Sequence, residues 1–433
     1  MSRNFLIVLP MISGSMRTIE PIGGWPVRFQ PTRRTRVMRY HSPHIQSQIL
    51  LYLKRRRFWR TLLMTGIVAG GPVCSPTAWA QSWDDCTAVH SPQRSIRACS
   101  AIITRGQEPN EAIAGAYNNR ALAYFNNGEF SRTIEDATRS IDLNPTFMGA
   151  YITRGEARHR NRDYDGAIID ASKAIDLDPL QAKSFFVRAL ALHAKGKHEA
   201  AIQDLNKAIE LNPKSAAAYF IRGNVFGDLF KYDLAIPDYE KAVELEPLFS
   251  EAYNQIGIAM TGKHDYARAV RSFDEAIETN PKYAEAFNNR GLSFRLMGQL
   301  DKAIQDFDKA IELDPTLSKA YTNRGQAYAG KGDYDRAIRD QNMAIKLAPD
   351  NVLFLNYRAQ SYLRSGRLQQ GLADIEAALI LIPGQPPLLY TRGEIFEALG
   401  RRDDAIADYR QVLKNDPSAQ SSRDALNRLG VSN

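Results

Sequence analysis

The chain has 433 residues, a formal net charge of +8 and three cysteines. Its length alone would suggest several globular domains. The positive charge lies at one end, because residues 1–80 hold 12 Lys or Arg and one acidic residue, whereas residues 81–433 carry a net charge of −3. The later residues therefore give little support to a nucleic-acid-binding surface, and no nucleic-acid partner is expected.

Residues 1–53 show no sustained helical or strand period in their apolar residues, and five prolines interrupt them. We expect this stretch to be disordered. A second interpretation is that the start of the chain is assigned too early. A start at Met38, or a non-methionine start near Leu50–Leu53, would bring the next segment close to the N-terminus.

Residues 54–80 combine the three parts of a secretory signal. The basic run Lys54–Arg60 precedes a mostly apolar run, Thr61–Cys74, and the small-x-small sequence Ala78–Ala80 follows. The pattern predicts cleavage before Gln81 and a periplasmic or secreted protein. The alternative is an uncleaved membrane anchor or a chance apolar segment. No other contact with a membrane is expected.

Residues 81–113 look like the two helices of a degenerate repeat that caps an array. Cys86 and Cys99 fall one in each helix. An even pair of cysteines in an exported chain predicts a disulfide between the two helices. Two buried, unlinked thiols are the alternative.

Residues 114–419 contain nine consecutive copies of a 34-residue unit without insertion or deletion. Each unit ends near a proline, and these prolines are Pro145, Pro179, Pro213, Pro247, Pro281, Pro315, Pro349, Pro383 and Pro417. In the unit that begins at Ala284, apolar and small residues recur three or four apart in two runs, separated by Gly298 and closed by Pro315. Each unit therefore predicts two short helices, and stacked units would bury a continuous core in one elongated array.

This unit resembles the tetratricopeptide repeat, which has an aromatic residue at position 4, a small residue at 8, alanine at 20 and 27, and proline at 32. Position 8 is glycine or alanine in all nine units, and position 27 is alanine in seven, from Ala174 to Ala378. Leu355 and Leu389 depart from the aromatic at position 4. The resemblance implies an all-α, right-handed superhelical solenoid of helix-turn-helix repeats.

Residues 420–433 follow the last unit. Ala425, Leu426 and Leu429 give Ser421–Leu429 one apolar and one polar face. This pattern suits a solvating cap helix and a short tail.

Arginine occupies position 7 in eight units, and aspartate occupies position 23 in eight units. One unit lacks both, with Ile256 and Ser272 in their places. Their joint loss indicates that the two side chains pair within a unit and bridge its helices. Two independently solvated faces are the alternative.

Motifs for catalysis and cofactors are missing from the sequence: it has no Gly-rich phosphate loop, nucleophile elbow, C-x-x-C or H-E-x-x-H. His159 and His193 both occupy position 12 of neighbouring units, but two histidines without a third ligand are more often polar surface residues. We therefore expect no enzymatic activity, cofactor or metal.

The resemblance implies that partners lie along the concave face and contact positions 2, 5, 9 and 12 of each first helix. Carried onto this chain, it assigns partner binding to Ile152, Phe186, Leu190, Phe220, Ile258, Asn288, Arg295, Lys319, Gln326 and Asn356. The alternative for Phe186 and Phe220 is packing between units. No unit has the lysine at position 5 that the family's clamp for chaperone tails uses.

The leading functional interpretation is a non-catalytic scaffold that binds a protein or peptide along its groove. The alternative is an accessory subunit that positions a catalytic partner of an envelope enzyme or export machine. The sequence does not indicate an oligomeric state.

Overall fold

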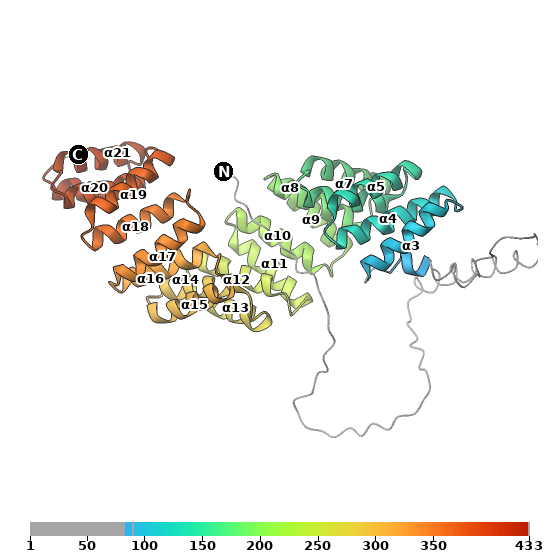
Figure 1. Cartoon of the computed structure of the whole chain (residues 1–433), viewed down its shortest axis with the longest axis horizontal. Helices are drawn as coiled ribbons and strands as arrows, with labels where there is room; N and C mark the ends of the chain where they lie inside the picture. The colour runs from blue at the N-terminus through green and yellow to red at the C-terminus, as the bar shows by residue number, and fades with distance from the viewer. Residues whose placement is uncertain (1–82, 89–90, 432–433) are drawn as a thin grey trace, which may run out of the picture. The chain divides into compact units, whose positions relative to one another are not determined.

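The computed structural model describes residues 83–88 and 91–431 (Figure 1). The predicted disordered stretch at 1–53 and the predicted signal at 54–80 lie outside the described residues. The described part is all-α, as predicted, and its helices follow one another as a solenoid of helix pairs. None of the helices in this part is long and apolar enough to span a bilayer.

Each unit contributes two helices that pack against each other and against the next unit. The first helices are α4 (Asn110–Asn126), α6 (Met148–Arg160), α8 (Ala182–Ala194), α10 (Ala216–Asp228), α12 (Ser250–Gly262), α14 (Ala284–Leu296), α16 (Ser318–Gly330), α18 (Val352–Arg364) and α20 (Pro386–Ala398). The second helices are α5 (Phe130–Leu143), α7 (Tyr164–Leu177), α9 (His198–Leu211), α11 (Tyr232–Leu245), α13 (Tyr266–Thr279), α15 (Leu300–Leu313), α17 (Tyr334–Leu347), α19 (Leu368–Leu381) and α21 (Arg402–Asn415).

The turn between the two helices of a unit requires one residue with positive φ, at position 15. Glycine supplies it in most units, for example Gly298 at φ +75°. Arg162, Phe230 and His264 adopt the same left-handed conformation at φ 65°, 58° and 62°. A side chain with a Cβ is less stable there than glycine, so these three turns carry local strain.

The glycine at position 8 of a first helix allows a large side chain from position 24 of the second helix to approach closely. A Cβ added at Gly291 would lie 2.7 Å from Phe307, and one added at Gly393 would lie 2.6 Å from Tyr409. Both aromatic rings are fully buried. In these two units the volume beside the glycine is therefore filled by the aromatic ring at position 24.

The helical segment at residues 83–86 and α3 (Pro92–Arg105) precede the first unit. The Cys86–Cys99 disulfide links them, which confirms the predicted bridge. Both cysteines are buried, in a cluster with Ile102 and Ala116. The Ser95 hydroxyl donates to the Cys86 carbonyl at 2.7 Å.

At the other end, α22 (Gln420–Arg428) packs on the last unit through the buried Ala425 and Leu426. Arg428 donates two hydrogen bonds to Glu397 of α20, at 2.9 and 2.8 Å. These contacts hold α22 across the end of the array, where it covers apolar surface that a further unit would otherwise cover.

Candidate functional site

The arginines at position 7 are structural. Each of the eight donates to both carboxylate oxygens of the aspartate at position 23 of its own unit, over 2.6–3.0 Å. The predicted pairing is confirmed, and the bonds to Asp306 raise the pKa of Arg290. In the exceptional unit a buried Ile256 replaces the arginine.

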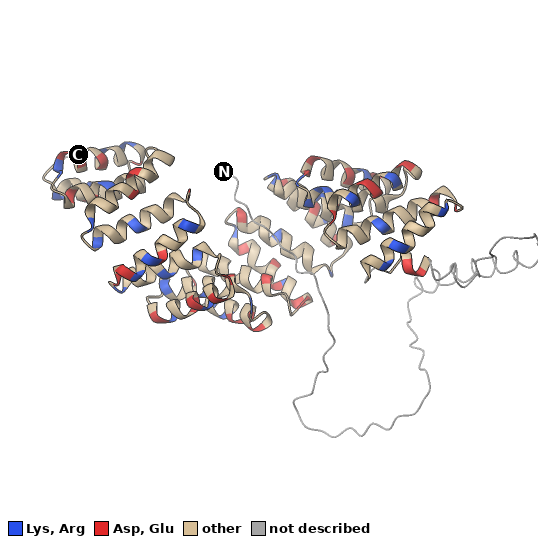
Figure 2. Ribbon diagram, in the orientation of Figure 1, with Lys and Arg blue, Asp and Glu red and all other residues tan. Residues whose placement is uncertain are grey.

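Most of these arginines also donate to the preceding unit, a contact that the sequence analysis did not find. Arg290 Nη1 lies 2.6 Å from Asp274, and Arg324 Nη1 lies 2.6 Å from Asp308. In six units the partner is a polar residue 16 residues before the arginine, and Arg120 instead donates to Ser100 of α3, 20 residues before it. The arginines therefore join unit to unit and are not available to a partner. Figure 2 shows basic and acidic residues interspersed along the described helices.

Two of the predicted partner-binding asparagines lie inside the array. Asn288 is buried, and its amide oxygen accepts a hydrogen bond from Asn323 of the next unit at 2.9 Å. Asn356 is also buried, and the next unit has Thr391 at the place of Asn323. The Asn356 amide oxygen has no hydrogen-bond partner in the described structure.

The predicted apolar residues also differ in exposure. Ile152 and Phe220 are buried, and the centroid of the Phe220 ring lies 4.7 Å from that of Phe249 and 5.9 Å from that of Tyr239, both in its own unit. Phe186 and Leu190 are partly buried and pack against the same core cluster. Phe220 is therefore a residue of the buried core.

The remaining four predicted residues lie nearer the surface. Ile258 and Lys319 are exposed, and neither lines the cavity that contains Arg295. Arg295 and Gln326 do share a cavity of about 570 Å³. This cavity is the candidate site.

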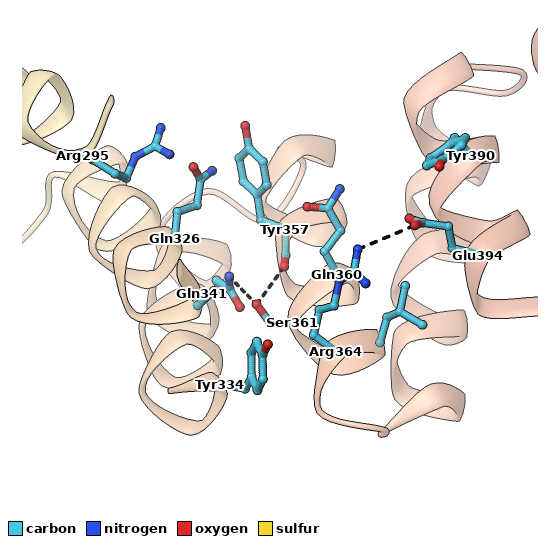
Figure 3. Close-up of a pocket in the computed structure, with 12 residues that line it drawn as sticks. Arg295, Gln326, Tyr334, Gln341, Tyr357, Gln360, Ser361, Arg364, Tyr390 and Glu394 are labelled. Atoms are coloured by element: carbon cyan, nitrogen blue, oxygen red, sulfur yellow. Dashed lines mark hydrogen bonds and ion pairs between the residues drawn. The ribbon is translucent and has the colours of Figure 1, made fainter. Parts of the chain in front are cut away.

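The cavity spans the first helices of four consecutive units, α14, α16, α18 and α20, with two residues from α17 (Figure 3). Several lining residues occupy positions 5, 9 or 12 of those helices. The lining consists of Arg295, Gln326, Ala329, Tyr334, Gln341, Tyr357, Gln360, Ser361, Leu363, Arg364, Tyr390 and Glu394. The structure therefore brings Arg295 and Gln326 together with residues that the sequence analysis did not assign, among them Tyr357 and Gln341.

Gln341 explains why the side of the cavity toward α17 is polar. It occupies position 24, where Phe273, Phe307 and Tyr409 fill the core of their units. Gln341 is just as buried, and its Nε2 donates to Ser361 Oγ at 2.9 Å. Its Oε1 has no hydrogen-bond partner in the described structure. A polar residue at an otherwise apolar repeat position is a signal that the sequence contained and that the analysis missed.

The two ends of the cavity differ in how their charged residues are paired. Arg295 projects into it from α14, and among the described residues no carboxylate lies within ion-pair distance of its guanidinium. Its buried Nε has no hydrogen-bond partner, and burial lowers the pKa of the group. Toward α20, Glu394 lies 3.7 Å from Arg364, and burial raises the pKa of this carboxyl.

The two histidines at position 12 lie elsewhere, on α6 and α8. Burial, together with the charges of Arg160 and His193, lowers the pKa of His159 to about 4. His193 Nε2 lies 2.9 Å from Asp228 Oδ2. Within the part of the chain that the structure describes, no three metal-ligating side chains converge.

Comparisons with known proteins identify the repeat. Sequence profiles described as "Tetratricopeptide repeat" match residues 118–182, 216–247, 284–317, 307–339 and 386–419, and a "TPR repeat" profile matches 189–229. The comparison with curated proteins gave no match.

Several solved structures are similar. MamA is 30% identical, over 37% of this chain and 93% of its own, with a TM-score of 0.35. YrrB, described as "a TPR protein with an unusual peptide-binding site", is 28% identical over 43% and 95%, with a TM-score of 0.36. The Cut9-Hcn1 hetero-tetramer of APC/C is 15% identical over 75% and 63%, with a TM-score of 0.50, and it supports the fold.

Proposed function

Because this chain belongs to the tetratricopeptide repeat family, whose fold is that of protein interaction scaffolds, we propose that it is a non-catalytic scaffold that binds a peptide segment in the cavity along α14, α16, α18 and α20. The cavity is the observation that supports this proposal most directly. Its lining comes from four successive first helices, so an extended segment would contact several units at once.

The lining is suited to a peptide more than to a small apolar ligand. Amide and hydroxyl groups of Gln326, Gln360 and Tyr357 project into the cavity together with the ring of Tyr390 (Figure 3). Such a mixture offers hydrogen bonds to a peptide backbone and flat apolar surface to its side chains.

A bulky residue inside the cavity tests the proposal. Ala329 lines it from α16, and Ala329→Trp would fill part of its volume. Ala373→Trp on α19 is the matched control, because Ala373 is exposed and outside the cavity. The probe is a random library of peptides of about ten residues, long enough when extended to pass four packed helices.

We expect peptides selected on the natural protein to lose at least about tenfold in affinity for Ala329→Trp and to retain it for Ala373→Trp. The helical circular dichroism signal of both variants should match that of the natural protein. Equal binding by both variants, or a failure to select any peptide on the natural protein, would contradict the proposed function.

We also propose that the protein works in an oxidising compartment outside the cytoplasm. The Cys86–Cys99 disulfide supports this location, since such bonds persist mainly in exported proteins. N-terminal sequencing of the native protein tests it, and the expected first residue is Gln81. A cytosolic protein with an intact Met1 start would refute the proposal.

A further inference from the structure

Arg295 differs from the arginines at position 7. Those arginines are satisfied by an aspartate of their own unit, whereas Arg295 has no carboxylate within ion-pair distance among the described residues. Its Nε is buried without a hydrogen-bond partner. A partly buried cation without a counter-charge is unfavourable, and an anion placed beside it would gain a charge-assisted hydrogen bond. The end of the cavity beside Arg295 therefore lacks a negatively charged group among the described residues.

Gln341 supplies a second, independent observation. Its side chain is only 1% exposed, it lines the same cavity, and its Oε1 has no hydrogen-bond partner. Because Nε2 is bonded to Ser361, the free atom is an acceptor that requires a donor. An inorganic anion without an O–H group, such as sulfate, would leave this acceptor unpaired. A peptide could satisfy both atoms, since it can place a carboxylate at Arg295 and an N–H group at Gln341.

The remaining charges favour an acidic segment over a basic one. Glu394 is the acidic residue of the lining, and Arg364 lies 3.7 Å from it. Arg295 therefore leaves the lining with one uncompensated positive charge. The amides of Gln326 and Gln360 lie between Arg295 and α20, and they add no charge to the lining (Figure 3).

We propose that the cavity recognises an extended peptide with an aspartate or glutamate side chain, which binds Arg295 while a peptide N–H group donates to Gln341. This inference rests on the proposed function. We assign the carboxylate to a side chain because the lining continues beyond Arg295 over three further first helices, so a segment passes along it.

The test uses synthetic peptide libraries of about ten residues with blocked ends, in which each position is varied in turn. We expect the natural protein to select Asp or Glu at one position. Arg295→Gln should lose that preference, and it should weaken the selected peptides by roughly tenfold or more, as expected for a hydrogen bond to a charged group. Arg295→Glu should select Lys or Arg at the same position. Arg271→Gln, which removes an exposed arginine of α13, should change nothing.

The outcomes separate the two proposals. Peptides that bind in the cavity without an acidic preference, or that bind Arg295→Gln equally well, would overturn the inference and leave the proposed function standing. Binding only by peptides with a free C-terminal carboxylate would overturn the assignment to a side chain. If no peptide binds the natural protein, the proposed function fails and this inference fails with it.

Gln341→Leu tests the second contact. It removes the free acceptor and keeps a similar volume in the core. We expect this variant to keep the acidic preference and to bind the selected peptides severalfold more weakly. Unchanged binding would remove Gln341 from the proposed site.

Discussion

The guanidinium of Arg324 donates to both carboxylate oxygens of Asp340, at 2.8 and 2.7 Å, and joins the two helices of one unit. Its third nitrogen donates to Asp308 of the preceding unit at 2.6 Å. The Arg324 side chain therefore links its own helix, α16, to both α15 and α17. Repetition of this contact supplies directional bonds between successive units.

Removing Arg324 should leave the buried Asp340 unpaired, whereas removing Asp340 should leave Arg324 with Asp308 as its carboxylate partner. We expect Arg324→Ala and Asp340→Ala to be non-additive, with a coupling free energy of roughly 0.5 to 3 kcal/mol. The exposed pair Lys309–Glu312 is the control, and its coupling should stay below about 0.5 kcal/mol. Denaturant unfolding of both double-mutant cycles measures the difference. Additivity for Arg324 and Asp340 would show that the bonds are energetically independent.

The strained turns predict a stabilising substitution. Arg162 is exposed and has φ 65°, a conformation that glycine adopts without steric cost. Arg162→Gly should raise the free energy of unfolding by about 1 kcal/mol. Gly298→Ala, at the equivalent turn with φ +75°, should lower it by a similar amount. If both substitutions change stability in the same direction, backbone strain is not the cause.

The disulfide should stabilise the N-terminal end of the array. It closes a loop with a sequence separation of 13, for which the chain-entropy estimate is roughly 3 kcal/mol. Replacing both cysteines by serine should therefore expose α3 to proteolysis before the later repeats. Limited proteolysis followed by mass spectrometry measures this. Equal resistance of the oxidised and substituted proteins would mean that packing alone holds α3.

Acidification should destabilise the early units through His159. Its pKa is about 4 in the folded protein and about 6.5 when unfolded, so the unfolded state takes up a proton first as the pH falls. Stability is therefore lost between about pH 6.5 and 4, by roughly 1 to 3 kcal/mol. His159→Gln should remove this part of the pH dependence. A variant with the same loss of stability would place the cause in other groups.

The sequence predicted the features that recur along the array. The helix pairs and the Arg–Asp pairing could be predicted because repeated spacing fixes which residues meet. The Cys86–Cys99 disulfide could be predicted because only two cysteines follow the predicted signal. The partner-binding residues were harder to predict. Position 5 can be buried inside the array, since Phe220 packs against Phe249 of its own unit and Asn288 accepts a hydrogen bond from Asn323 of the next unit.

The polar side of the candidate cavity toward α17 results from one residue, Gln341, that departs from the repeat pattern. Gln341 lies on a second helix, and the family's assignment of partner contacts to first helices gave no reason to consider it. A comparison of position 24 across the nine units would have found it, because buried polar residues at apolar positions require a specific hydrogen-bond arrangement.

The central claim is that a peptide binds along the first helices of four consecutive units. Hydrogen exchange of the natural protein, with and without a peptide selected on it, tests this most directly. We predict slower exchange in 284–296, 318–330, 352–364 and 386–398 and no change in 164–177, 232–245 or 266–279. Protection confined to the second helices, or to the units before residue 250, would contradict the assignment of the site.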